Sequence, residues 1–173
     1  MKGFFLILAV ISLIVSLSGC TEVLPGQAPV TPTTDLATRE QDQAFTEAWN
    51  GSISTIGPLK DRFSRDLEKK DWTAVAASAA ELMTATEQQY YAMSRYAVSP
   101  ELHEIQADYL LYLQEVNQAA EEGSQAVVAA TGNNPEIAIE HSEKAETLIR
   151  SAESSLDLAT EAMDSYAKKG VSS

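Results

Sequence analysis

The chain has a single cysteine, few aromatic residues and far fewer basic than acidic residues. One cysteine cannot form a disulfide within the chain, nor can it supply a multi-cysteine zinc or iron–sulfur site. With 12 Lys and Arg against 25 Asp and Glu, the formal net charge is −13. Nucleic acid and anionic lipid headgroups both require a basic surface, so the charge argues against either as a direct ligand. The length of 173 residues suits one domain with a tail.

The sequence patterns of common catalytic and cofactor sites are also missing. Neither His103 nor His141 belongs to a Glu-x-x-His pair of the di-iron type, because Pro100 and Ala138 stand three residues before them. There is no Cys-x-x-Cys-His haem motif, nucleophile elbow, phosphate-binding glycine loop or His-Glu-x-x-His helix. We interpret His141 as a boundary histidine with a solvent-facing nitrogen. We therefore expect no enzymatic activity, no cofactor and no metal site.

The N-terminus contains the one long apolar run, in the segment MKGFFLILAVISLIVSLSGC. As a helix, residues 4–17 would rise about 21 Å, which is shorter than the roughly 30 Å hydrocarbon core of a bilayer. Lys2 provides a minimal positive start. These features favour a signal peptide over a permanent membrane span.

The signal segment ends in Leu17, Ser18, Gly19 and Cys20. This ending resembles the lipobox of prokaryotic lipoproteins, where Leu-(Ser/Ala)-(Gly/Ala)-Cys precedes the cleavage site. The resemblance implies that residues 1–19 are removed and that Cys20 carries a thioether-linked membrane lipid. The alternative is an uncleaved signal anchor. Either arrangement places the rest of the chain outside the cytoplasm, in a periplasm or at the cell surface, similar in type to small helical lipoproteins.

Residues 20–35 are expected to form a lipid-anchored flexible tether, since they include Pro25, Pro29 and Pro32 and show no apolar period. From residue 36 onward, apolar residues recur at spacings of three and four, which is typical of amphipathic helices. The predicted helices cover about 36–70, 72–97, 100–131 and 135–169. Because the connections between them are short, the sequence predicts an all-α, up-down-up-down antiparallel four-helix bundle over residues 36–170.

Helix-boundary residues agree with this division. Asp71 can cap the second helix, and the third and fourth begin with Ser99-Pro100-Glu101 and Asn134-Pro135-Glu136. Gly132 is a plausible stop for the third helix. Thr38 with Gln41 could form a capping box in the first helix. We expect Gly57-Pro58 to kink the first helix without ending it.

Large and small side chains separate along the predicted bundle. Most aromatic residues fall at the end where the tether enters, and five of them form a possible ligand pocket: Trp49, Tyr90, Tyr109, Tyr112 and Tyr166. The alternative is that these rings are ordinary core. At the opposite end, alanines of the second helix should face alanines of the third and allow close packing: Ala74, Ala76, Ala77, Ala79, Ala80, Ala119, Ala120, Ala126, Ala129 and Ala130.

Charge is unevenly distributed as well. No Lys or Arg occurs from Tyr96 to Glu143, and basic residues gather at 60–70. We expect the basic end of the first helix to lie level with Glu115–Glu143. The acidic stretch is either a solvated face or a face for a basic protein partner or metal ion. The predicted function is a membrane-anchored structural or protein-interaction module without catalysis; the alternative is a solute-binding or sensory bundle. Asn50-Gly51-Ser52 matches a glycosylation acceptor, which we attribute to chance.

Overall fold

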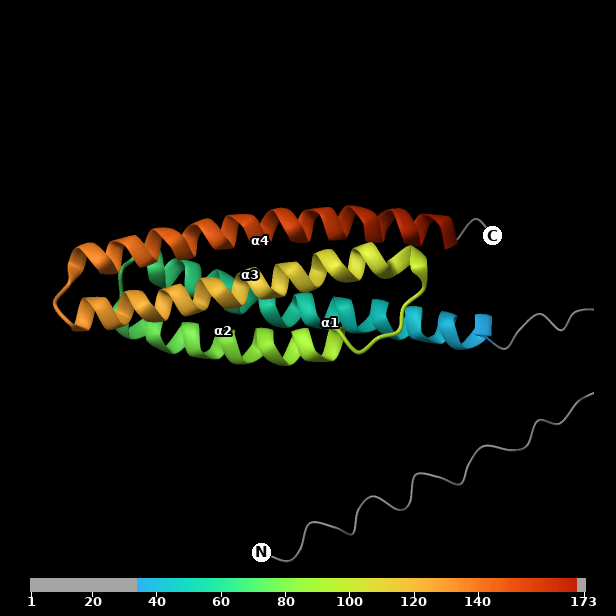
Figure 1. Ribbon diagram of the computed structural model, residues 1–173, viewed down its shortest axis with the longest axis horizontal. Helices are drawn as coiled ribbons and strands as arrows, with labels where there is room; N and C mark the ends of the chain where they lie inside the picture. Colours follow the sequence, from blue (N-terminus) through green and yellow to red (C-terminus); the bar gives the residue numbers. More distant parts are fainter. Residues whose placement is uncertain (1–33, 171–173) are drawn as a thin grey trace, which may run out of the picture. The chain divides into compact units, whose positions relative to one another are not determined.

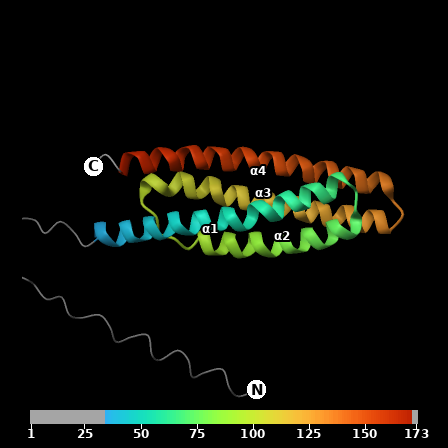
Figure 2. The same ribbon diagram turned by 180° about the vertical axis from the view of Figure 1, so that it is seen from behind.

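The computed structural model describes residues 34–170, with side chains over residues 37–168, and this part of the chain contains helices and no strand. The four helices are α1 (Thr34–Glu68), α2 (Trp72–Met93), α3 (Pro100–Thr131) and α4 (Pro135–Gly170). They run alternately up and down, and both views show the same bundle (Figures 1 and 2). The predicted all-α four-helix bundle is confirmed. The predicted signal peptide and nearly all of the predicted tether lie outside the described residues.

The observed helix bounds differ from the predicted ones mainly in α1 and α2, and α1 ends at Glu68, two residues before the expected end. Helix α1 begins at Thr34, two residues before the expected start, so Thr38 lies inside the helix and not at its cap. Helix α2 ends at Met93 and not at residue 97. The side-chain amide of Gln106 donates to the carbonyls of Met93 and Tyr96, at 2.9 and 3.1 Å, which satisfies backbone acceptors beyond the helix end. Residues 94–99 therefore cross the end of the bundle as a loop.

The turns use some of the expected boundary residues in unexpected ways. The Asp71 carboxylate accepts a hydrogen bond from the Ala74 amide at 3.1 Å, as expected of a cap. Ser99 stands at the cap of α3, but its side chain makes no capping hydrogen bond. At the α3–α4 turn the left-handed residue is Asn133, with a φ of 60°, whereas Gly132 has a φ of −78°. The helix end expected at Gly132 therefore depends on the left-handed backbone conformation of Asn133.

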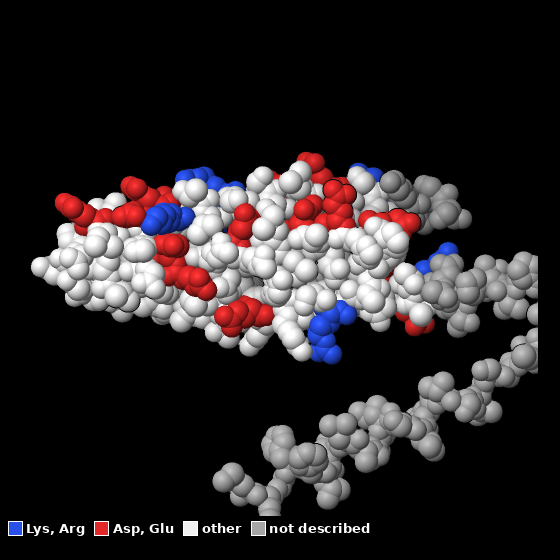
Figure 3. Space-filling view, viewed as in Figure 1, with Lys and Arg blue, Asp and Glu red and all other residues white. Residues whose placement is uncertain are grey.

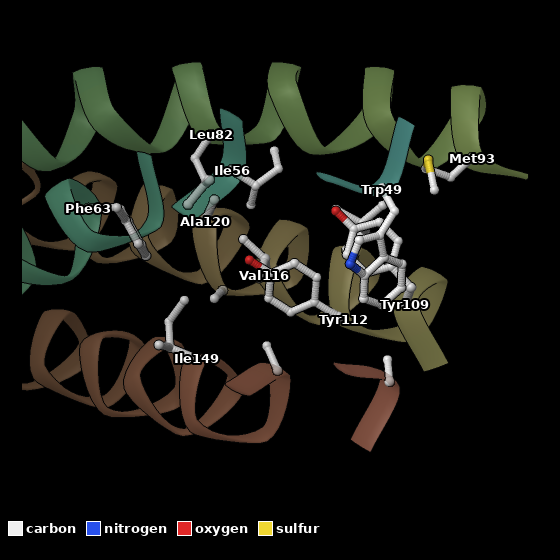
Figure 4. Packing of buried hydrophobic residues seen from close by; sticks show 14 of the residues in the cluster. Trp49, Ile56, Phe63, Leu82, Met93, Tyr109, Tyr112, Val116, Ala120 and Ile149 are labelled. Atoms are coloured by element: carbon white, nitrogen blue, oxygen red, sulfur yellow. The ribbon is translucent and has the colours of Figure 1, made fainter. Parts of the chain in front are cut away.

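Helix α1 continues through Gly57 and Pro58 as predicted, without an intervening loop. Its apolar side packs against the other helices in one core (Figure 4). The largest side chains that are almost completely buried come from α1 and α3, among them Phe45, Phe63, Tyr109 and Tyr112. The core therefore follows the apolar stripes of the sequence.

The most extensive helix packing is between α3 and α4, whereas the alanines had led us to expect close packing of α2 against α3. Helix α3 contacts α4 most extensively, followed by α2. Of the five alanines expected to point from α2 toward α3, only Ala79 is buried, and Ala76, Ala77 and Ala80 are exposed. In contrast, α4 buries Ala145, Ala152 and Ala159 completely. Small side chains at seven-residue spacing allow α3 and α4 to approach each other closely.

Gly123 in α3 makes room for the Phe63 ring of α1. A Cβ atom at this position would lie 2.5 Å from Cε2 and 2.6 Å from Cζ of Phe63. Real Cβ atoms do not come that close to a carbon neighbour, so the Phe63 ring occupies the space that a side chain at residue 123 would need. The lack of a side chain at residue 123 therefore lets the Phe63 ring reach α3.

The basic end of α1 lies level with Gly123 of α3, as expected, because the Phe63 ring reaches that glycine, but the ion pairs of Lys60 and Arg62 involve the other two helices. Lys60 donates to Glu153 of α4 at 2.5 Å and lies 3.3 Å from Asp61. Arg62 pairs with Glu81 of α2. Burial alone would lower the pKa of Lys60, but its hydrogen bonds and charge interactions with Glu153 and Asp61 outweigh that effect, so the pKa is raised.

Candidate functional site

Three of the five residues predicted to line a pocket lie together in the core. The ring centroids of Trp49 and Tyr109 are 4.2 Å apart, and those of Tyr109 and Tyr112 are 5.6 Å apart with the rings stacked. The exposed fractions are 3% for Trp49, 0% for Tyr109 and 1% for Tyr112. Figure 4 shows these rings between the ribbons of the bundle. Their contacts with one another are those of tightly packed core residues.

The hydroxyl group of Tyr109 is used inside the protein. It donates a hydrogen bond of 2.6 Å to the Oγ atom of Ser52 on α1, so a buried polar group has a partner. Burial raises the pKa of Tyr109 to about 12, although the hydrogen bond to Ser52 lowers it in part. Burial also raises the pKa of Tyr112, as do the charges of Asp61 and Glu153. Both phenols are therefore neutral at physiological pH, and they act as packing groups.

Tyr90 and Tyr166 pack against this core from its edge. The Tyr166 hydroxyl donates to Oδ2 of Asp42 at 3.2 Å, and the Tyr90 hydroxyl accepts from Gln114 at 3.2 Å. Burial raises the pKa of Tyr166, as does its contact with the Asp42 carboxylate. The hydroxyls of the two tyrosines are thus engaged at separate places on the bundle.

Asp42 is a polar residue of the core that our sequence reasoning missed. Its exposed fraction is 7%, and its Oδ1 atom accepts a 2.8 Å hydrogen bond from the backbone amide of Ser99. Together with the bond from Tyr166, this carboxylate joins α1, the α2–α3 loop and α4. The available signal was its spacing, because Asp42 lies three residues before Phe45 on the apolar stripe of α1.

A surface groove of about 400 Å³ runs between α2 and α3, and Tyr90 is one of its lining residues. At its base, the Asn117 side chain donates to Oγ1 of Thr86 at 2.9 Å and to the Met83 carbonyl at 3.3 Å. The rim carries Glu87 and Glu121. The groove therefore combines an aromatic ring and amide groups with negative charge.

A second groove, of about 430 Å³, lies between α3 and α4 and is lined by Glu122, Glu140, Glu143, Lys144, Thr147 and Leu148. His141 borders it half-buried, with Nδ1 2.6 Å from a carboxylate oxygen of Glu122. The hydrogen bond and charge of Lys144 lower the pKa of Glu140. His141 thus lies at the boundary of the bundle, with one nitrogen directed at a carboxylate of α3.

Acidic side chains continue from this groove along the same pair of helices. Glu115 accepts hydrogen bonds from Ser151 at 2.6 Å and Ser155 at 2.8 Å, both across the α3–α4 boundary. Asp108 and Glu104, which lie seven and eleven positions before Glu115, are on the same side of α3. We call this surface the α3–α4 acidic face; it consists of Glu104, Asp108, Glu115, Glu122, Glu140 and Glu143. Figure 3 shows acidic side chains along the boundary between these helices, and an uncharged tip at the left end.

Within residues 34–170, no three His, Cys, Asp or Glu side chains come together in a way that could hold a metal ion. None of the helices in that range is both long enough and apolar enough to cross a membrane. The predicted lipidation site at Cys20, with Leu17, Ser18 and Gly19, lies outside the described residues.

Comparison with known proteins identifies no relative of this chain. No protein-family model matches the chain, and no curated protein and no solved structure is significantly similar to it.

Proposed function

We propose that this protein is a lipoprotein attached to the cell membrane through Cys20, with its helical bundle facing outside the cytoplasm as a non-catalytic structural or protein-interaction module. The observation that carries the proposal is the sequence Leu17-Ser18-Gly19-Cys20 directly after an apolar run of signal-peptide length. The single cysteine of the chain stands at the position where lipidation requires it. More than one acyl chain on this residue would hold the protein stably on the membrane.

The described bundle supports a role in interaction more than in chemistry. Several of its buried polar groups bond to one another, as in the Tyr109 hydroxyl with Ser52 and the Asp42 carboxylate with the Ser99 amide. The two strongly perturbed phenols, Tyr109 and Tyr112, are shielded inside the core and have no access to a substrate. What the bundle presents to its surroundings is mainly acidic surface, which is suited to a basic partner.

Chemical cross-linking in membranes that contain the full chain tests this proposal. We expect a discrete cross-linked species with another protein, which disappears when Cys20→Ala releases the chain into the soluble fraction. Ser18→Ala is the matched control, because the lipobox accepts Ser or Ala at that place; this variant should stay on the membrane and keep the cross-link. Failure to find a cross-linked partner under several mild conditions would contradict an interaction role.

A second candidate function is the binding of a small solute, and the groove beside Tyr90 is the observation that favours it. The groove of about 400 Å³ is large enough for a small molecule and offers an aromatic ring, amides and carboxylates. A cationic solute would suit these groups. Thermal shift with a set of small amines tests the idea: stabilisation should occur in the unmodified chain and weaken in Glu121→Gln. If no amine shifts the melting temperature, this function is excluded.

A further inference from the structure

We propose that the α3–α4 acidic face, together with two exposed leucines beside it, binds a basic amphipathic helix of a partner protein. This inference deepens the interaction role proposed above and depends on it. It specifies where the partner sits and which chemistry the partner has.

Two leucines lie next to each other on the outer side of the α3–α4 pair. Leu111 is 45% exposed and Leu158 is 60% exposed. Leu111 lies four residues before Glu115 on α3, and Leu158 lies three residues after Ser155 on α4. Glu115 and Ser155 are hydrogen-bonded, and the helices are antiparallel, so both steps lead about one turn toward the same end of the bundle. The two leucines are therefore level and on the same side.

Carboxylates extend in both directions from these leucines. On α3, Asp108 lies one turn beyond Leu111, and Glu115 and Glu122 follow on the other side at helical spacing. The hydrogen bonds to Glu115 come from neutral serine hydroxyls, so its charge stays uncompensated. At Glu122 the strip meets the α3–α4 groove of about 430 Å³, whose single basic lining residue is Lys144. An apolar contact point thus lies within a long negative strip.

The charge and the length of this surface together indicate which kind of partner binds it. The strip from Asp108 to Glu122 is about 21 Å long as a helix, which matches about four turns of a partner helix. An amphipathic helix can place leucine-sized side chains on Leu111 and Leu158 while its Lys or Arg residues reach the carboxylates. A second copy of this chain would bring its own net charge of −13 against the same surface. Anionic lipid headgroups would be repelled in the same way.

A designed peptide tests the surface directly. The probe is a fluorescent, end-capped Leu/Lys peptide of about 15 residues with helical amphipathic spacing. Its binding to the full chain in neutral detergent is measured by fluorescence anisotropy. We expect binding that weakens as salt is raised, because exposed charges are screened. A scrambled peptide of the same composition, which cannot form an amphipathic helix, should bind at least about tenfold more weakly.

Variants of the chain then locate the site. Leu111→Ser with Leu158→Ser should weaken peptide binding about tenfold or more, because two apolar contacts are lost. The matched control is Val128→Ser, which alters a side chain that is 64% exposed near the C-terminal end of α3 and should leave binding unchanged. Glu104→Gln with Asp108→Asn should weaken binding, whereas Glu47→Gln with Glu87→Gln, which removes the same charge from exposed positions on α1 and α2, should have a smaller effect. All of these side chains lie at or near the surface, and circular dichroism checks that each variant is folded.

Several outcomes would overturn the inference. They are equal binding of the scrambled peptide, equal loss in the two charge variants, unchanged binding in the leucine variant, and no binding at micromolar peptide in low salt. Saturable dimer formation by the chain alone, lost in the leucine variant, would assign the face to a second copy. The proposed function fails separately: if membrane cross-linking finds a partner whose contacts lie away from α3 and α4, the interaction role stands and this surface is wrong.

Discussion

Replacing Gly123 by alanine tests whether α1 and α3 meet through the Phe63 ring. The added methyl group would lie 2.5 Å from the Phe63 ring, which is fully buried and packed on all sides. The ring or the helix must therefore move. Overpacking of this kind typically costs about 1–3 kcal/mol.

The same substitution also favours the helix, since alanine in a helix interior is about 1 kcal/mol better than glycine. The net effect of Gly123→Ala is thus expected between about 0 and 2 kcal/mol of destabilisation. Gly51→Ala is the matched control, because Gly51 lies inside α1 and a Cβ there meets no atom within 4 Å. The free energy of unfolding of that variant should rise by about 0.5–1 kcal/mol, because alanine favours the helix over glycine and meets no neighbour there. The gap between the two variants, about 1–3 kcal/mol, measures the contact with Phe63.

Urea unfolding of the full chain, followed by circular dichroism, provides both free energies of unfolding. Phe63→Leu with Gly123→Ala extends the test to a double-mutant cycle, and the double variant should lose less stability than the sum of the two single variants. If Gly123→Ala stabilises the protein as much as Gly51→Ala does, the close contact between α1 and α3 is wrong. If the effects of the two substitutions on the free energy of unfolding are additive, the contact between Phe63 and Gly123 is refuted as well.

Three further predictions concern the buried polar groups and an ion pair. Asp42→Ala should cost about 1–3 kcal/mol in urea unfolding, because the buried Ser99 amide loses its acceptor; a neutral effect would contradict the assigned bond. The pKa of Tyr109 is raised from 10.0 to about 12, so the unfolded chain releases this proton first, and the contribution of Tyr109 to the free energy of unfolding should fall by about 1.4 kcal/mol per pH unit between those values. Tyr109→Phe should remove this share of the alkaline loss, and an unchanged pH slope would count against a buried phenol. Glu153→Gln should lower stability by less than about 1 kcal/mol, since Glu153 is half exposed, and the difference should shrink in high salt.

The fold was predictable because its signals are local and repeated. Apolar spacing of three and four residues marks each helix, and Asp71, Pro100 and Pro135 stand at the observed helix starts. Short connections leave antiparallel packing as the simplest arrangement. Apolar spacing is less informative at the end of α2, where Tyr96 and Val98 contribute to the core from a loop. A buried side chain does not show whether its backbone is helical.

The contacts between helices were harder to predict, because a stripe defines the buried face of a helix and not the rotation of its neighbours. The basic end of α1 lies level with α3 as expected, but Lys60 pairs with Glu153 on α4 and Arg62 pairs with Glu81 on α2. Similarly, the aromatic residues were placed at one end of the bundle, but their sequence positions did not show that Tyr109 would contact both Trp49 and Tyr112 in the core. Asp42 was missed because the sequence does not show that a single acidic residue on an apolar stripe has buried hydrogen-bond partners, here Ser99 and Tyr166.

Mass spectrometry of the N-terminal peptide from membrane-extracted protein tests the central claim most directly. After trypsin cleavage, the account predicts a peptide that begins at Cys20, ends at Arg39 and carries a thioether-linked lipid on the cysteine. Recovery of a peptide that begins at Gly3, or of one that contains unmodified Cys20, would contradict lipid anchoring and with it the proposed role at the membrane.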